Sequence, residues 1–403
     1  MHEPTLGSRA LFPTLDVDVY VNHAAISPPS AAVRDAVITT LDGYGRQGVA
    51  QFPVEMARRD RVRHALARLM GAEAVDVALI PNTSAGMTDI ALCLPWQRGD
   101  RILLFRGEFP ANVTPWQRAA AVHGLEIVWL DAEDFRLDRA AALADFEAAL
   151  RRGIRLVAVS QVQFATGQHM PIGVFGALCA EFGAELFVDA IQGLGVVPID
   201  VQTAGVHYLS AGGHKWLMGS EGTGVLYVAP ESAAALRPNV ASWLSHDEPF
   251  SFLFEGPGLL RYDRPIVQRA GMVEGGSANV LGIAALEASV GLLREIGIDA
   301  IYDHVQAWHD AMEPLLVARG FVSARMTDPA GRSGTLSLQP PGHAGAPAWW
   351  AALAGHGISC ACPDGWLRLA PHWPNALDEP QRIAAAVDAI LATGGPRAEI
   401  QAP

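Results

Sequence analysis

The sequence predicts an α/β protein with a mainly parallel β-sheet that helices cover on both faces. Between residues 77 and 230, short runs rich in β-branched and other apolar residues alternate with longer amphipathic stretches. Strands spaced by helices in this way are typical of a parallel sheet that is covered on both sides. Of the 403 residues, 50% are hydrophobic and only 18% are charged, so the chain has ample apolar surface for a buried core.

Seven short segments in the first part of the chain are predicted strands. They cover residues 77–81, 101–105, 125–130, 155–161, 184–189, 207–212 and 224–229. Ligands of such sheets bind beyond the carboxyl ends of the strands. The motifs at these ends are NTSAG (82–86), GEFPAN (107–112), DAIQG (189–193) and SAGGHKW (210–216).

The chain changes character near residue 278. At roughly 150 residues per domain, we expect two or three domains, or one large domain with a smaller companion. A long apolar helix candidate from residue 278 is followed by alternating helical and β-like segments. We therefore expect a large domain over 29–277 and a small α+β domain over 278–403. The N-terminal segment 1–28 is expected to pack with the small domain.

Charge and composition exclude several functions. The formal net charge is −13 and no long basic run occurs, so we expect neither nucleic acid nor a membrane surface as partner. We find no signal peptide and no membrane-spanning run, and we expect a cytoplasmic protein. Cys93, Cys179, Cys360 and Cys362 are too few for a disulfide framework. The last two form a CxC pair without further ligands, so no metal site is expected.

One lysine, Lys215, stands among 28 arginines. A coding bias toward arginine explains most of this ratio, and a leftover surface lysine is an equally simple reading of the count. An ammonium group, however, can lose its proton when desolvated and attack a carbonyl, whereas a guanidinium stays charged. Asp189 ends a predicted strand and would share a crevice with Lys215. A Schiff-base lysine and an aspartate for the pyridinium nitrogen are the two side chains that pyridoxal phosphate (PLP) requires.

The order of these motifs resembles that of the class V aminotransferases. This fold-type-I PLP family includes cysteine desulfurases, selenocysteine lyases, and kynureninase-like and isopenicillin-N-epimerase-like enzymes. The resemblance runs from YVNHAAISPP (20–29) to WLRLAPHWPNALDE (366–379). It implies a PLP-binding large domain with a mainly parallel sheet, a smaller α+β C-terminal domain, an amino-acid substrate, and a homodimer with shared active sites.

The resemblance also implies which residues contact the cofactor ring. Lys215 of GGHKW would form the Schiff base, with His214 beside it. Asp189 would pair with the pyridine nitrogen and Gln192 would bind the ring hydroxyl. Phe109 of EFPAN falls at the ring-stacking position.

Two segments would hold the cofactor phosphate. NTSAG supplies Thr83 and Ser84 at the start of a predicted helix, where backbone N–H groups, hydroxyls and the helix dipole favour an anion. Ser84 could instead be an ordinary N-cap. EGGSAN (274–279) supplies Ser277, which by resemblance reaches the phosphate of the neighbouring subunit.

The substrate side of the site is expected around Arg368. By resemblance this arginine of WLRLAPHW binds the substrate α-carboxylate, a planar anion that suits a guanidinium fork. Residues near Asn22 and His23, together with the segment 240–265, are expected to line the side-chain pocket.

The chain departs from the cysteine desulfurases at the loop that carries their nucleophilic cysteine. ISCACPDGWLR (358–368) runs directly into the arginine, and the loop looks deleted. We therefore expect Cys360 and Cys362 to be packed or adventitious rather than sulfur acceptors.

Two further departures lie near the expected cofactor. Gln163 and Phe164 stand where desulfurases carry Ser-Asn, so that Gln192 would hold the ring hydroxyl largely alone. Gly212 stands where they carry a phosphate-binding serine.

These features predict a PLP-dependent enzyme that acts on an amino acid. Because most of the resemblance is to desulfurase-like members, we favour C–S or related Cβ cleavage of a cysteine-like substrate without a persulfide cysteine. Transamination, epimerisation and decarboxylating deamination stay open. A non-catalytic PLP-fold ligand sensor would not need Lys215, Asp189 and Arg368 together. A nicotinamide-dependent dehydrogenase, suggested by GLGVVP (193–198), lacks the third glycine of G-x-G-x-x-G.

Overall fold

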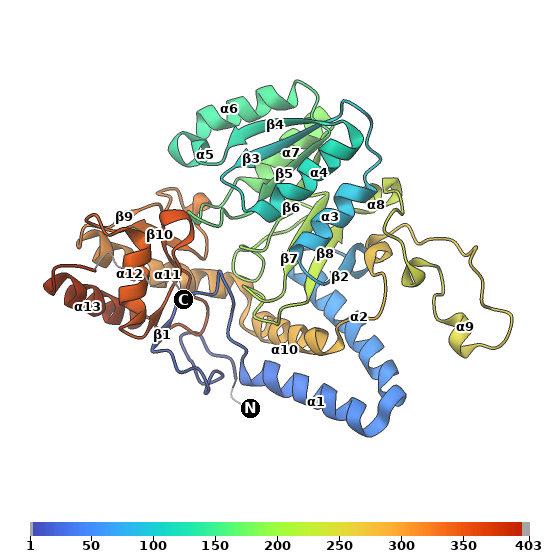
Figure 1. The fold of residues 1–403 in the computed structure, drawn as a ribbon, viewed down its shortest axis with the longest axis horizontal. Coiled ribbons are helices and arrows are strands. Elements are labelled where there is room, and N and C mark those ends of the chain that lie inside the picture. Colours follow the sequence, from blue (N-terminus) through green and yellow to red (C-terminus); the bar gives the residue numbers. More distant parts are fainter. Residues whose placement is uncertain (1–2, 397–403) are drawn as a thin grey trace.

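A computed structural model describes residues 3–396 of the chain. A seven-stranded sheet lies at its centre, with the strand order β2-β8-β7-β6-β5-β3-β4 (Figure 1). The strands are β2 (Val77–Ile80), β3 (Arg101–Arg106), β4 (Glu126–Asp131), β5 (Leu156–Ser160), β6 (Glu185–Asp189), β7 (Tyr208–Gly212) and β8 (Gly224–Val228). Strands β3 to β7 pair in parallel, whereas β8 runs antiparallel to both β7 and β2. The predicted mainly parallel α/β fold is confirmed.

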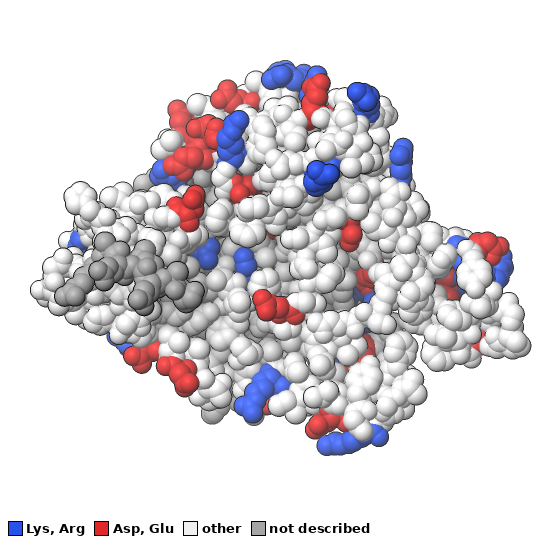
Figure 2. Space-filling model, in the orientation of Figure 1, with Lys and Arg blue, Asp and Glu red and all other residues white. Residues whose placement is uncertain are grey.

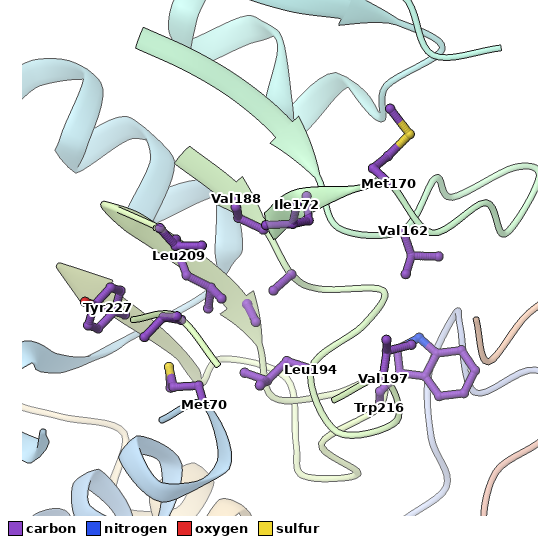
Figure 3. Packing of buried hydrophobic residues seen from close by; sticks show 14 of the residues in the cluster. Met70, Val162, Met170, Ile172, Val188, Leu194, Val197, Leu209, Trp216 and Tyr227 are labelled. Carbon is purple, nitrogen blue, oxygen red and sulfur yellow. The ribbon is translucent and has the colours of Figure 1, made fainter. Parts of the chain in front are cut away.

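Successive residues of the inner strands point to opposite faces of the sheet. In β5, Val157 and Val159 belong to one buried cluster, while Leu156 and Ala158 belong to another. Both faces are therefore apolar, which explains why these strands are continuous hydrophobic runs rather than alternating ones. Figure 3 shows part of the first cluster, with Trp216 among its members.

Helices cover both faces of this sheet. Phe146 of α6 (Arg139–Leu150) and Phe175 of α7 (Ile172–Phe182) pack into the first cluster. Met87 of α3 (Thr83–Cys93) and Trp116 of α4 (Thr114–His123) pack into the second. The remaining helices of this half are α1 (Ala31–Gln47), α2 (Phe52–Leu69), α5 (Asp134–Leu137), α8 (Pro230–Ala235) and α9 (Ser251–Phe254).

The C-terminal part contains a separate, smaller sheet. Its strands have the order β12-β10-β9 and pair antiparallel. They are β9 (Val322–Ser323), β10 (Leu336–Gln339) and β12 (Leu367–Leu369), and the helices of this part are α10 (Val280–Ile296), α11 (Ile298–Val317), α12 (Gly345–Ala354) and α13 (Glu379–Ala392).

An N-terminal segment of the chain pairs with the C-terminal part. The short strand β1 (Val19–Tyr20) pairs in parallel with β11 (Ile358–Ser359). Helix α10, in contrast, packs against α1 and α2, so it contacts the N-terminal half although it follows residue 278. The domain boundaries given above stay a prediction.

The surface and the helices bear on the expected partners. Acidic and basic side chains are interspersed on the face that Figure 2 shows, with wide uncharged areas between them. None of the helices within residues 3–396 combines the length and the apolar character that a membrane crossing needs.

Candidate active site

The carboxyl ends of β6 and β7 bring Asp189 and Lys215 to the same edge of the sheet. Asp189 is the last residue of β6 and lies in register with Ser210 of β7. The chain leaves β7 at Gly212 and reaches Lys215 after a short turn. Asp189 is only 2% exposed and Lys215 is half-buried. Two chain segments that are separate in sequence thus place an acid and an amine close enough for their charges to act on each other.

The charged groups around Lys215 and Asp189 shift one another's pKa. Burial lowers the pKa of Lys215 to about 8, the Arg368 guanidinium lowers it as well, and Asp189 opposes both effects. Burial raises the pKa of Asp189 to about 7; the charge of Glu108 adds to this shift and that of Lys215 opposes it. A lysine with a pKa near 8 has a substantial neutral fraction close to neutral pH, which a nucleophilic amine needs. A cationic pyridinium beside Asp189 would favour its ionised form.

The start of α3 offers a phosphate site. Asn82 caps this helix, since its Oδ1 accepts a hydrogen bond of 2.9 Å from the Ala85 N–H. Thr83 is buried, and its Oγ1 has no hydrogen-bond partner among the described residues, while Ser84 is exposed. An unpaired hydroxyl beside the free N–H groups of a helix start fits an anion. The alternative reading of Ser84 as the N-cap is wrong, because the Asn82 side chain already fills that role.

The aromatic ring of Phe109 lies near the Lys215 amine. Phe109 is 48% exposed, and the Lys215 Nζ lies 5.9 Å from the ring centroid. Phe164 meets the same ring edge to face, with 5.4 Å between the ring centroids. An exposed aromatic ring at this distance from the amine fits the predicted stacking position.

Gln192 and His214 are placed by neighbouring groups of the chain. The Gln192 Nε2 donates to the Ala24 carbonyl at 3.1 Å, and its Oε1 accepts from the Trp216 Nε1 at 2.9 Å. One amide N–H therefore stays available for a ring hydroxyl. The His214 imidazole packs over Gly212, where an added Cβ would lie 3.1 Å from the ring. This contact gives a physical reason for glycine where desulfurases carry serine.

Arg368 comes from the small sheet and points toward the same place. It lies on β12 and is 5% exposed. Its Nη1 donates to the Phe164 carbonyl at 2.8 Å, whereas its buried Nε has no partner within the described part of the chain. Burial lowers the pKa of Arg368 to about 10. A buried guanidinium with an unused N–H is costly unless an anion meets it.

Asn22 and His23 contribute to the site in different ways. The Asn22 Oδ1 is buried and unpaired among residues 3–396. The His23 Nδ1 lies 2.8 Å from the Ser27 Oγ, which in turn donates to the Lys215 carbonyl at 2.6 Å. Burial lowers the pKa of His23 well below its usual range, so its imidazole is neutral. His23 thus contacts the turn at Lys215 indirectly, through the Ser27 hydroxyl.

Two expected contributors lie elsewhere in a single chain. Ser277 is exposed in the segment that precedes α10. The segment 240–265, which includes α9, projects away from the sheet edge that carries Lys215 (Figure 1). Within one chain α9 therefore lies apart from β6 and β7, and the place of this segment at the side-chain pocket stays a prediction.

Sequence reasoning assigned no role to Glu108, which is a second buried carboxyl group of the site. It is 9% exposed, and burial raises its pKa while hydrogen bonds from Ser160, Gln163 and Asn112 oppose that shift. Its place directly before Phe109 in EFPAN was the only signal available. Nothing in the sequence indicated that its partners would come from the end of β5.

The cysteines near Arg368 are poorly suited to nucleophilic chemistry. Cys360 is buried, and burial raises its pKa to about 12. Cys362 is half-buried, and burial raises its pKa as well. Both thiols are therefore shifted away from the reactive thiolate. The described residues contain no cluster of three or more His, Cys, Asp or Glu side chains suited to a metal ion.

Comparison with known proteins places this geometry in a family. The family profile described as Aminotransferase class-V matches residues 19–346. An uncharacterized aminotransferase of Bacillus subtilis, YcbU, is 26% identical over 95% of this chain and 96% of its own length. The isopenicillin N epimerase of Streptomyces clavuligerus is 27% identical over 96% and 98% of the two chains.

Solved structures agree on the fold. The cystine C–S lyase C-DES, in complex with its reaction product cysteine persulfide, superposes with a TM-score of 0.80 and 22% identity over 93% of this chain and 98% of that one. The lysine, the buried aspartate and the helix start with its unpaired hydroxyl fit the PLP that this family uses. The chain belongs to the class V aminotransferase family and is a PLP-dependent enzyme.

Proposed function

We propose that this enzyme binds an amino acid through its α-carboxylate and cleaves a C–S or related bond at Cβ, without a cysteine of its own that accepts the sulfur as a persulfide. The observation that carries the first part is the buried Arg368, whose Nε has no partner in the described structure and whose charge acts on Lys215. An anionic group of the substrate would meet that N–H next to the reactive amine.

Different residues of the chain would bind the cofactor and transfer protons. When bound, PLP supplies an electron sink for the negative charge that develops at the substrate Cα. Asp189 would hold the proton at the pyridine nitrogen, and Lys215 would take or return the proton at Cα. Phe109 would fix the plane of the ring. The remaining contacts fall to Thr83, Ser84, Gln192 and His214, and to Ser277 of a neighbouring subunit.

Two arguments support Cβ cleavage without a sulfur-accepting cysteine: the similarity to C–S lyases and desulfurases, and the raised pKa values of the two thiols near Arg368. The structural neighbour named above is a cystine C–S lyase, and relatives in Dickeya dadantii and Enterobacter carry the name cysteine desulfurase. The raised pKa values of Cys360 and Cys362 argue against a sulfur-accepting thiolate. Epimerisation is the second candidate, because the likeness to isopenicillin N epimerase extends over nearly the full chain.

A homodimer with shared active sites is also proposed. Ser277 is exposed, and the segment 240–265 projects with large apolar side chains in solvent, among them Phe254 and Tyr262. A cavity of about 480 Å³ beside Ser84 and Phe109 is lined mainly by apolar side chains of α3 and α4. Both surfaces would be covered by a second copy. Localisation in the cytoplasm stays a prediction.

Replacing Lys215 should remove the covalent attachment of PLP. Because no other lysine occurs in the chain, Lys215→Ala should lack the chromophore that borohydride fixes to the protein. Lys215→Arg, which keeps the charge but cannot form the imine, serves as the matched control and should behave alike. PLP that stays covalently bound in either variant, measured by mass spectrometry, would refute the role of Lys215.

Replacing Arg368 should selectively weaken the use of amino acids. Loss of one partner of a charge-assisted pair should cost about 2–5 kcal/mol, or roughly 30- to 5,000-fold in kcat/KM. Arg368→Lys should also fail, because an ammonium cannot form the fork. Amines without a carboxylate should be affected little, and PLP should stay bound.

A suitable control for this experiment is Arg325, another buried arginine, which pairs with Asp310 and Glu313 in the C-terminal part. Arg325→Ala should leave the preference for amino acids over amines unchanged. If Arg368→Ala loses PLP instead, the arginine serves the cofactor, and if it keeps full activity on amino acids, the proposed carboxylate site is wrong.

Removing the thiols near Arg368 should leave turnover nearly unchanged. Neither Cys360→Ser nor Cys362→Ser eliminates a reactive thiolate, since burial disfavours that form at both positions. Steady-state kinetics with a cysteine-like substrate provide the measurement. A fall of about 100-fold in Cys362→Ser, roughly 2.7 kcal/mol of barrier, would instead support persulfide transfer.

Dilution tests the shared site. If a second copy completes each site, specific activity should fall in parallel with dissociation, when light scattering and activity are followed over the same concentration series. A monomer that keeps full activity would contradict the proposed dimer.

A further inference from the structure

The loop that follows β5, residues 161–168, is termed the bridging loop. It folds back on itself: the Gln163 N–H donates to the Gln168 carbonyl and the Gly167 N–H donates to the Gln163 carbonyl, both at 2.9 Å. Val162 and His169 form an antiparallel bridge at its base. These internal hydrogen bonds connect the two arms of the bridging loop to each other.

Glu108 fastens this loop to the central sheet. Its Oε1 accepts hydrogen bonds from the Ser160 N–H at 2.7 Å and from the Gln163 Nε2 at 3.0 Å. Its Oε2 pairs with the Ser160 hydroxyl. A single buried carboxyl group therefore holds both the last residue of β5 and the first turn of the bridging loop.

The small sheet holds the same loop from the other side. Three side chains donate to carbonyl oxygens of the loop: Ser333 to Gly167 at 2.5 Å, Ser337 to Ala165 at 2.6 Å, and Arg368 to Phe164 at 2.8 Å. Ser337 and Arg368 lie directly opposite each other in the register of β10 and β12. The guanidinium of Arg368 is therefore placed by a carbonyl whose own position depends on the bridging loop.

We propose that Glu108 is a positioning residue for Arg368: by fastening the bridging loop, it sets the Phe164 carbonyl that orients the guanidinium toward a substrate carboxylate. This inference rests on the proposed role of Arg368 in binding that carboxylate. It assigns a function to a carboxyl group that accepts hydrogen bonds from Ser160 and Gln163 of the chain itself.

Glu108 could also act through its charge, because it raises the pKa of Asp189. Two substitutions separate these roles. Glu108→Gln removes the charge but keeps a carbonyl oxygen that can accept from the Ser160 N–H and the Gln163 Nε2. Its amide N–H can donate to the Ser160 hydroxyl oxygen. Glu108→Ala removes both the charge and the hydrogen bonds. Rescue by glutamine is expected for positioning and is not expected for an effect of charge.

The test compares binding of L-alanine and of ethylamine, which lacks the carboxylate, to the PLP-loaded enzyme. Binding is followed by the change in PLP absorbance. Glu108→Ala should weaken L-alanine by about tenfold, the value of roughly one charge-assisted hydrogen bond, and ethylamine by less than about twofold. Glu108→Gln should stay within about threefold of the wild type for both ligands.

A matched control is available on α2. Glu55 is also buried; it accepts from the Gln51 Nε2 at 2.8 Å and pairs with Arg58, so Glu55→Ala removes buried hydrogen bonds of a carboxylate away from the site. It should not change the ratio of the two affinities. Ser337→Ala, which releases the Ala165 carbonyl, should repeat the selective loss of L-alanine and serves as the test if Glu108→Ala does not fold.

Two further readouts decide the interpretation. Hydrogen exchange of a peptide that covers residues 160–169 should be faster in Glu108→Ala than in Glu108→Gln. In an Arg368→Ala background, Glu108→Ala should cause no further loss of L-alanine affinity, because both changes act on one interaction.

Several results would overturn the proposal. Equal weakening of both ligands by Glu108→Ala, or equal damage by glutamine and alanine, would assign Glu108 to the cofactor or to the charge of Asp189. Selective loss in Arg368→Ala without selective loss in Glu108→Ala would reject the positioning role alone. Absence of selective loss in Arg368→Ala itself would reject the proposed carboxylate site.

Discussion

The balance of charge at the carboxyl edge of the central sheet is the constraint on which the rest of the site depends. Lys215 and Arg368 supply two cationic groups there, and Asp189 and Glu108 supply two carboxyl groups; three of these side chains are buried and Lys215 is half-buried. A buried charge without a partner costs several kcal/mol. The charge of each group therefore affects whether its neighbours are ionised, as the pKa shifts of Lys215 and Asp189 show. The sheet brings three of them together and the small sheet adds the fourth, which explains why the site needs both parts of the chain.

Much of the fold could be predicted because its causes are local. The seven strands of the central sheet begin and end within two residues of the predicted positions, since strands covered on both faces need apolar residues throughout. Lys215 was predicted because it is the only lysine of the chain, and Asp189 because it ends an apolar run shortly before that lysine. Glu108 was not, because its burial depends on Ser160 and Gln163, which only tertiary folding brings near it.

Other details of the site could not be predicted from the sequence. The alternative in which Ser84 caps the helix does not hold, because the neighbouring Asn82 accepts the hydrogen bond from the Ala85 N–H and Ser84 is exposed. The segment 240–265 is expected at the side-chain pocket, and within one chain it projects away from the central sheet (Figure 1). Sequence patterns report which residues are apolar or polar, and they carry little information on the direction in which a long loop leaves the domain. Gly212 was seen as a departure from the desulfurases, and the packing of His214 above it supplies the reason.

The single lysine has a consequence for the handling of this protein. A protease that cuts only after lysine has one target in the 403 residues, the bond between Lys215 and Trp216. Trp216 is fully buried and its indole is held by Gln192, so this bond is protected while the core beneath the site is intact. Cleavage into two fragments therefore reports the opening of the site by a simple change of mass, independent of any substrate.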